Sequence, residues 1–149
     1  MQPLNRRFFL AGGAVNIFML ASPAIAAVPV FYRSPGCGCC HVWTERMAAA
    51  GLPVALEDSE DLSAISAKLG VPADLQGCHV GEIDGYIISG HVPPADITRL
   101  LQERPQARGL LVPGMPMGSP GMEMSGQTEP YDVLMLMANG TTKVFTSYS

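Results

Sequence analysis

Apolar and polar positions repeat with two periods along the chain, and together they predict alternating strands and helices. Short apolar runs that are partly β-branched predict strands at 28–33, 53–56, 78–83 and 86–89. Apolar residues spaced near 3.6 predict helices at 40–50, 62–69 and 94–104. The resulting order is β-α-β-α-β-β-α, in which a helix joins the first two strands.

Turn and cap residues refine this order. Asp61 is a suitable N-cap for the second helix, and Gly70 is a suitable stop. Asp84-Gly85 between two apolar runs predicts a tight hairpin, so the third and fourth strands should be antiparallel. The first two strands should be parallel because a helix connects them. The pattern predicts an α/β, thioredoxin-like fold: a mixed four-stranded sheet with helices on both faces.

Two further segments follow these elements. Residues 109–130 are rich in Gly, Pro and Met and lack periodicity, which predicts a long loop. The runs 131–137 and 142–148 flank Asn139-Gly140, a typical hairpin turn. The chain should therefore end in a β-hairpin after the loop.

The first 26 residues have the composition of an export signal. Arg6-Arg7 precede an apolar run over 8–20, and Ala24-Ile25-Ala26 supplies a small-residue cleavage site. Arg6-Arg7-Phe8-Phe9 resembles a twin-arginine signal. The alternative, an uncleaved anchor, is disfavoured because the run is short and contains Gly12 and Gly13. Residues 27–149 should form the exported domain, in an oxidising compartment outside the cytoplasm, with no membrane segment after cleavage.

Composition narrows the function. The 149 residues carry a formal charge of −4 and no basic cluster, which argues against a nucleic-acid partner. Charged residues make up 15% and apolar residues 48%, which excludes a disordered chain. Nine Met and four Cys are unusual for this length, so sulfur chemistry is the first candidate for function.

Three cysteines lie where the first predicted strand meets the first helix, in Cys37-Gly38-Cys39-Cys40. Unpaired N–H groups at a helix start favour thiolates, the form that binds metal or attacks disulfides. Three interpretations stay open. They are a structural disulfide framework, a redox-active Cys37–Cys40 pair, and a soft-metal site for Cu(I).

Cys78 is the fourth cysteine, at the entry to the third strand. In a thioredoxin-like fold that entry lies beside the start of the first helix, so Cys78 should approach the cluster despite 38 residues of separation. The alternative is a buried, inert cysteine. His79 and His91 are additional candidate ligands, although His79 should face away from Cys78 if both lie in one strand. His41 should point away from the cluster.

Methionines concentrate in the predicted loop. Met115, Met117, Met122 and Met124 lie among Gly and Pro residues, where there is no helical or strand face for them to fill. Thioethers are soft, uncharged ligands suited to Cu(I). Metal binding by this loop and simple packing over the site both remain open.

Several separated motifs carry a family resemblance. They are Cys37-Gly38-Cys39-Cys40, Gly70-Val71-Pro72, Gly77-Cys78-His79, Gly90-His91-Val92-Pro93 and the segment 112–122. These motifs resemble the CopG-type periplasmic proteins, a thioredoxin-like family once catalogued as a domain of unknown function and associated with copper resistance in Gram-negative bacteria. The resemblance implies a copper centre with a proposed redox role. Its implied ligands are Cys37, Cys39, Cys40 and Cys78.

Two functions follow from these observations. The first is a periplasmic protein that holds Cu(I) on four thiolates, as a bridged multinuclear cluster, in copper resistance and homeostasis. Its candidate enzymatic activity is copper-dependent oxidation or reduction, and its partners would be copper ions and a periplasmic copper-efflux or copper-carrier protein. The second is a thiol–disulfide oxidoreductase that uses Cys37 and Cys40, with Cys39 or Cys78 as resolving thiol. A disulfide-stapled binding module is a third, simpler alternative.

Overall fold

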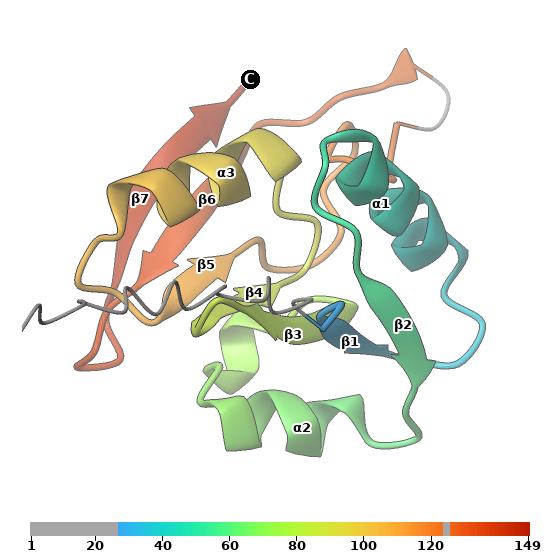
Figure 1. Ribbon diagram of the computed structural model, residues 1–149. Helices are drawn as coiled ribbons and strands as arrows, with labels where there is room; N and C mark the ends of the chain where they lie inside the picture. Colours follow the sequence, from blue (N-terminus) through green and yellow to red (C-terminus); the bar gives the residue numbers. More distant parts are fainter. Residues whose placement is uncertain (1–26, 124–125) are drawn as a thin grey trace, which may run out of the picture.

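A mixed seven-stranded sheet forms the centre of the protein (Figure 1). The computed structural model describes residues 27–123 and 126–149, so the predicted export signal at 1–26 lies outside the described residues. The elements in chain order are β1 (Val30–Arg33), α1 (Gly38–Ala49), β2 (Ala55–Asp58), α2 (Leu62–Leu69), the 3-10 turn η1 (Ala73–Leu75), β3 (His79–Ile83), β4 (Tyr86–Ser89), α3 (Pro94–Glu103), β5 (Gly109–Leu111), β6 (Tyr131–Leu136) and β7 (Thr142–Tyr148).

The pairing of the first four strands follows the sequence pattern. β1 pairs parallel with β2 on one side and antiparallel with β3 on the other, and β3 pairs antiparallel with β4. Asp84 and Gly85 both have positive φ, 48° and 84°, as a two-residue hairpin requires. Asp61 caps α2 by accepting a hydrogen bond from the Ala64 amide at 2.9 Å, and Gly70 ends that helix.

The sheet is larger than the four strands that the sequence predicts, because part of the predicted loop 109–130 is a strand. Gly109–Leu111 forms β5, which pairs parallel with β4 and antiparallel with β6. Three residues are too few to show a period of two, which explains why the pattern missed β5. The predicted C-terminal hairpin is present as β6 and β7. Since β5 bridges it to β4, it extends the same sheet.

Helices cover both faces of the sheet. Figure 1 shows α1 and α3 on one face and α2 on the other. Neighbouring residues of β4 and β5 pack on opposite faces of the sheet. Ile88 and Leu110 pack in the core cluster that contains the α1 and α3 side chains. Ile87 and Leu111 pack in the cluster that includes the apolar side of α2. No helix within residues 27–123 and 126–149 is long and apolar enough to cross a membrane.

The C-terminal hairpin is tied to α3 through a buried carboxylate. Asp96 accepts hydrogen bonds from the hydroxyls of Thr146, at 2.6 Å, and Tyr148, at 2.7 Å. The Arg99 guanidinium also donates to the Phe145 carbonyl at 2.8 Å. The two hydroxyl bonds satisfy a carboxylate that would otherwise be costly to bury, and all three bonds link α3 to β7.

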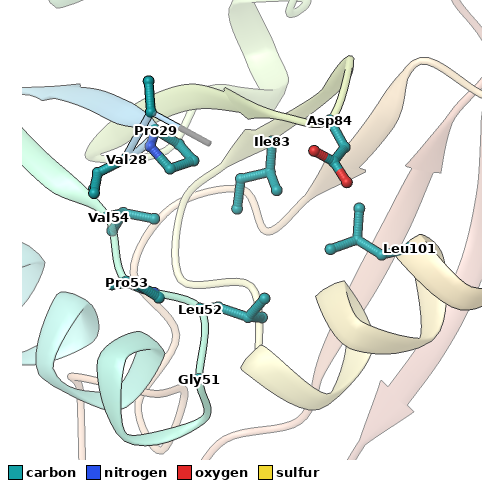
Figure 2. A pocket seen from close by; sticks show the side chains of 10 residues that line it. Val28, Pro29, Gly51, Leu52, Pro53, Val54, Ile83, Asp84 and Leu101 are labelled. Carbon is teal, nitrogen blue, oxygen red and sulfur yellow. The ribbon is translucent and has the colours of Figure 1, made fainter. Parts of the chain in front are cut away.

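The two ends of α1 differ in chemistry. Its C-terminal end borders an apolar pocket of about 250 Å³, which lies between the residues around Leu52 and the side chains of Ile83 and Leu101 (Figure 2). Asp84 is the single ionisable side chain in its lining. The cysteine motif lies at the N-terminal end of α1, so the candidate chemistry is concentrated there.

Candidate metal centre

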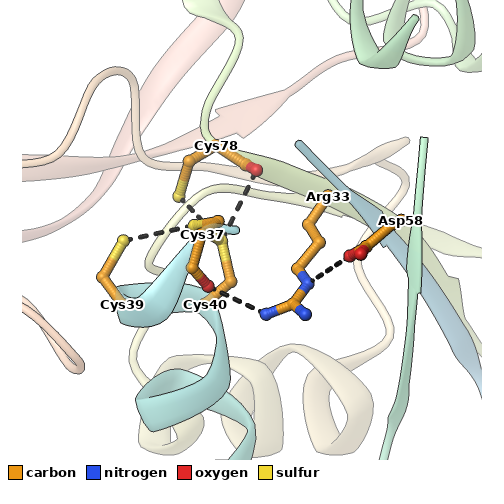
Figure 3. Close-up of polar contacts among 6 residues, drawn as sticks. All are labelled: Arg33, Cys37, Cys39, Cys40, Asp58 and Cys78. Atoms are coloured by element: carbon orange, nitrogen blue, oxygen red, sulfur yellow. Dashed lines mark hydrogen bonds and ion pairs between the residues drawn. A yellow bond between two sulfur atoms is a disulfide. The ribbon is translucent and has the colours of Figure 1, made fainter. Parts of the chain in front are cut away.

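The cysteine motif occupies the first turn of α1. Cys37 is the N-cap residue and its side chain makes no capping hydrogen bond, so the N-cap side chain leaves the backbone N–H groups of this first turn unpaired. The Arg33 guanidinium in β1 donates to the Cys37 carbonyl at 2.9 Å and pairs with Asp58 of β2 at 2.7 Å (Figure 3). This chain of bonds anchors the motif to two neighbouring strands.

A disulfide joins Cys37 and Cys40, while Cys39 and Cys78 are free thiols. Each free thiol lies against one end of the disulfide. The Cys39 Sγ is 3.3 Å from the Cys37 Sγ, and the Cys78 Sγ is 3.5 Å from the Cys40 Sγ (Figure 3). All four sulfur atoms lie within 4.8 Å of one another. The structure therefore places Cys78 at the cluster, as the sequence analysis expects.

Two glycines explain how Cys78 reaches the cluster. A Cβ on Gly77 would clash with the Gly90 backbone, and a Cβ on Gly90 would clash with the Val112 carbonyl, so neither position has room for a side chain where the chain entering β3 lies against the end of β4. The Gly77 amide donates to the Ser89 hydroxyl at 3.2 Å, and the Gly90 amide donates to the His79 carbonyl at 2.9 Å. This close approach brings Cys78 and His91 to the same place.

His91 presents a lone pair to Cys78. Its Nδ1 lies 2.7 Å from the Pro120 carbonyl, which can only accept, so Nδ1 carries the proton. Its Nε2 is then unprotonated and lies 3.0 Å from the Cys78 Sγ. Burial lowers the pKa of His91, so the ring is neutral near pH 7.

His79 also faces Cys78, which corrects the expectation that it points away. Its Nδ1 is 3.4 Å from the Cys78 Sγ. The expectation was wrong because β3 begins at His79, so Cys78 precedes the strand and does not obey its alternation. The ring packs against Trp43 with centroids 4.2 Å apart, and within the described residues its Nε2 has no hydrogen-bond partner. Burial lowers the pKa of His79 to about 3.

Burial acts in the opposite direction on the Cys78 thiol. Burial first, and the neighbouring Cys39 second, raise the pKa of Cys78 to about 12. Without a cation, Cys78 is therefore protonated near pH 7. A bound metal ion would compensate the desolvated thiolate, and binding would release the proton. His41 does not join this group, because it is exposed and pairs with Glu45 at 3.6 Å.

The methionine segment contributes one side chain near the sulfur cluster. The Met115 Sδ lies 4.0 Å from the Cys39 Sγ, and Met115 is half exposed. Met117 and Met122 are partly buried, with their backbones bonded to Glu129 and to Ser119, respectively. Met124 lies outside the described residues.

The loop that carries these methionines is held against α1 by features that the sequence analysis did not identify. Gly121 has φ +95°, and a Cβ there would lie 2.7 Å from the Cys39 carbonyl and 3.1 Å from His91 Nδ1. Glu123 accepts a hydrogen bond from the Gly121 amide at 2.7 Å and pairs with Arg46 of α1 at 3.2 Å. The available signal was a Gly/Pro-rich stretch that contains Glu123, but the sequence does not reveal that the partner of Glu123 is Arg46 on α1.

Comparisons with known proteins show which family this chain belongs to. Residues 75–122 match a family described as "Protein of unknown function, DUF411". A solved structure named "Copper resistance protein copG- Form 2" is 41% identical, with a TM-score of 0.77, and the match covers 82% of this chain and 98% of that chain. The chain belongs to the CopG family. A second CopG structure, "Form 1", is 42% identical, with a TM-score of 0.76, and the match covers 81% of this chain and 96% of that chain. A comparison with curated proteins found no match.

Proposed function

We propose that this CopG-family chain binds Cu(I) in its reduced state and acts in copper resistance and homeostasis. The observation that carries the proposal is the placement of four cysteine Sγ atoms within 4.8 Å of one another. Thiolates are soft ligands that favour Cu(I) over harder ions. Two solved structures of the family are named as copper resistance proteins. The proposed ligands are Cys37, Cys39, Cys40 and Cys78.

Four thiolates at this spacing favour more than one copper ion. Cu(I) is satisfied by two or three sulfur ligands, so bridging sulfurs can share several ions among four cysteines. The Met115 thioether lies at the Cys39 side of the group and supplies a fifth soft donor. We therefore propose a thiolate-bridged multinuclear Cu(I) cluster, with Met115 at its exposed side.

The disulfide supports a redox role for the same residues. Two Cu(II) ions can each take one electron from the reduced Cys37 and Cys40 pair. The products are two Cu(I) ions and the disulfide, and any thiol protons are released. A further round requires a separate step, in which an external dithiol reductant is oxidised to its disulfide while Cys37 and Cys40 return to thiols. This balance makes the protein a copper oxidoreductase whose electrons come from its own cysteines.

The proposal also covers where the protein acts, namely outside the cytoplasm after export. Residues 1–26 are proposed as a cleaved, twin-arginine-like signal, and residues 27–149 as a periplasmic, thioredoxin-like domain that exchanges copper with an efflux or carrier protein. The arrangement of β1, α1 and β2 beside the β3–β4 hairpin supports the thioredoxin-like assignment. A disulfide in this chain is stable in an oxidising compartment, which agrees with the proposed location.

Copper stoichiometry of the reduced protein tests the site. The Cys37→Ser/Cys39→Ser protein should lose most bound Cu(I) when it is titrated without oxygen, against a competing chelator. His41→Gln is the matched control, because His41 lies beside the motif but is exposed and paired with Glu45. Equal copper stoichiometry in the double variant and the wild type would refute the four-thiolate site.

Thiol–disulfide exchange is a second candidate, favoured by one specific observation. The Cys37–Cys40 disulfide lies at the start of α1, with free thiols 3.3 Å and 3.5 Å from its sulfur atoms. Those thiols can attack either end and move the bridge within the protein. Metal-free protein that reduces insulin with a dithiol donor would support this function, and no turnover would exclude it.

A further inference from the structure

We infer that the disulfide form of the protein keeps a second metal site, made by Cys78, His79 and His91, for a divalent cation of borderline softness. One ligand atom from each residue lies within 4.8 Å of the other two. The inference extends the proposed function, since Cys78 would serve both donor sets in turn. Its geometry and its chemistry are independent of the Cys37 and Cys40 thiolates.

The separations fit one shared ion. Zinc-like ions bind sulfur at about 2.3 Å and nitrogen at about 2.0 Å, so tetrahedral S and N ligands lie about 3.5 Å apart. The observed distances are 3.0 Å from the Cys78 Sγ to His91 Nε2 and 3.4 Å to His79 Nδ1. Small shifts of these side chains are sufficient to admit the ion.

The disulfide decides which donors remain. When Cys37 and Cys40 are joined, neither sulfur is available as a thiolate. Cys39 keeps its thiol, with the Met115 thioether as its soft neighbour at 4.0 Å. Cys78 keeps its thiol with two imidazoles. Among the cysteine-containing groups of the described residues, the set with Cys78 therefore remains complete when the disulfide forms.

The imidazoles are already oriented. The Pro120 carbonyl accepts from His91 Nδ1–H at 2.7 Å and leaves Nε2 with its lone pair aimed at Cys78. A backbone carbonyl behind a ligating histidine is the usual way in which proteins fix the tautomer and the ring at a metal site. His79 is fully buried, with its ring held between Trp43 and His91. Little side-chain freedom is lost when an ion binds.

The donor types select the ion. One thiolate and two imidazoles suit Cu(II), Zn(II) or Co(II), whereas an all-thiolate set suits Cu(I). Both histidines are fully buried, while Cys78 retains partial exposure and gives the ion its access. The same centre thus presents soft donors when it is reduced and borderline donors when Cys37 and Cys40 are oxidised.

Co(II) titration of the oxidised protein tests the inference. Full-length mature protein with the disulfide intact, without reductant, should bind one equivalent of Co(II). The complex should show thiolate-to-Co(II) charge transfer and tetrahedral d–d bands, which Zn(II) abolishes by displacement. In the wild-type protein, a paramagnetically shifted imidazole N–H that exchanges slowly should report His91 Nδ1–H behind the metal. Absence of charge transfer, or of any shifted imidazole proton, would overturn the site without requiring a variant.

Variants separate this site from the copper cluster. Cys39→Ser should leave Co(II) binding of the oxidised protein within twofold of wild type while lowering Cu(I) stoichiometry of the reduced protein. His91→Gln should weaken Co(II) binding at least tenfold and leave the four cysteines in place.

The outcomes distinguish failure of this inference from failure of the proposed function. If reduced protein binds no Cu(I) but oxidised protein still gives the Co(II) spectrum, the proposed function fails and this site stands. If Cu(I) binding is intact while His91→Gln leaves Co(II) binding unchanged, this inference fails alone.

Discussion

The two free thiols flank one disulfide but lie in different surroundings. Cys39 is in the first turn of α1, beside the partly exposed Met115 thioether. Cys78 lies at the entry to β3 between two buried imidazoles, and burial raises its pKa to about 12. The Cys39 flank therefore offers two soft sulfur donors, a thiol and a thioether, that solvent can reach. On the Cys78 flank, a charged thiolate needs a cation beside it.

The largest expected effect concerns the buried imidazoles of the Cys78 flank. His79 has a pKa of about 3 in the folded protein, well below the ordinary value of about 6.5. Below pH 6.5 the unfolded chain takes up a proton that the folded chain excludes. The free energy of unfolding should therefore fall by up to about 1.4 kcal/mol per pH unit between pH 6.5 and 3.

Urea denaturation of the metal-free, oxidised protein at several pH values measures this slope. His79→Gln should reduce it, because the titrating group is removed, whereas His41→Gln should leave it unchanged because His41 is exposed. His91 contributes in the same direction, since burial also lowers its pKa. Unfolding free energies that do not depend on pH between 6.5 and 4 would contradict the assignment of neutral, buried imidazoles.

The next effect is the alkylation rate of the Cys78 thiol. A pKa near 12, against an ordinary value of 9.0, lowers its thiolate fraction about a thousandfold. The greater nucleophilicity of a more basic thiolate restores part of this loss, which leaves a reaction roughly 50-fold slower. We expect iodoacetamide to label Cys78 in folded, metal-free protein at about that fraction of its rate in urea.

Peptide mass spectrometry under non-reducing conditions assigns the label, and Cys39 should be modified before Cys78. Cys78→Ser is the control that removes the slow site. The contrast between the two flanks would be lost if both thiols reacted at equal rates in the folded protein.

Gly121 touches both flanks, so its substitution should disturb both at once. A Cβ at this position would press on the Cys39 carbonyl and on His91 Nδ1, and the residue also has φ +95°. We expect Gly121→Ala to lower stability by about 1–3 kcal/mol, from strain and overpacking together. Gly140→Ala is the matched control: its φ is +82°, but a Cβ there meets nothing within 4 Å. Equal losses in the two variants would mean that only backbone strain matters at Gly121.

The sequence pattern predicted the positions of the four cysteines better than it predicted the contacts of the buried histidines beside them. The cysteine spacing and the strand-to-helix junction place Cys37, Cys39 and Cys40 together because local chain geometry is sufficient. Cys78 could be placed only through the predicted topology. The inward orientation of His79 could not be predicted, since it depends on where β3 begins, and that is set by the Gly77–Gly90 approach across the sheet. The contact between His91 and the Pro120 carbonyl could not be predicted from the sequence, because every residue type carries a backbone carbonyl that can accept a hydrogen bond.

The smallest expected effect concerns the ion pair that ties the methionine loop to α1. Arg46 and Glu123 pair at 3.2 Å, but both side chains are about half exposed, so the pair should stabilise the protein by less than about 1 kcal/mol. Glu123 also accepts a hydrogen bond from the Gly121 amide at 2.7 Å, and this bond should matter more locally. In Glu123→Gln the global unfolding free energy should change little, while the Gly121 amide should exchange hydrogen several-fold faster. Arg46→Gln, which removes only the ion pair, should leave that exchange rate almost unchanged. If Arg46→Gln accelerates exchange as much as Glu123→Gln does, the ion pair rather than the carboxylate–amide bond holds the loop against His91.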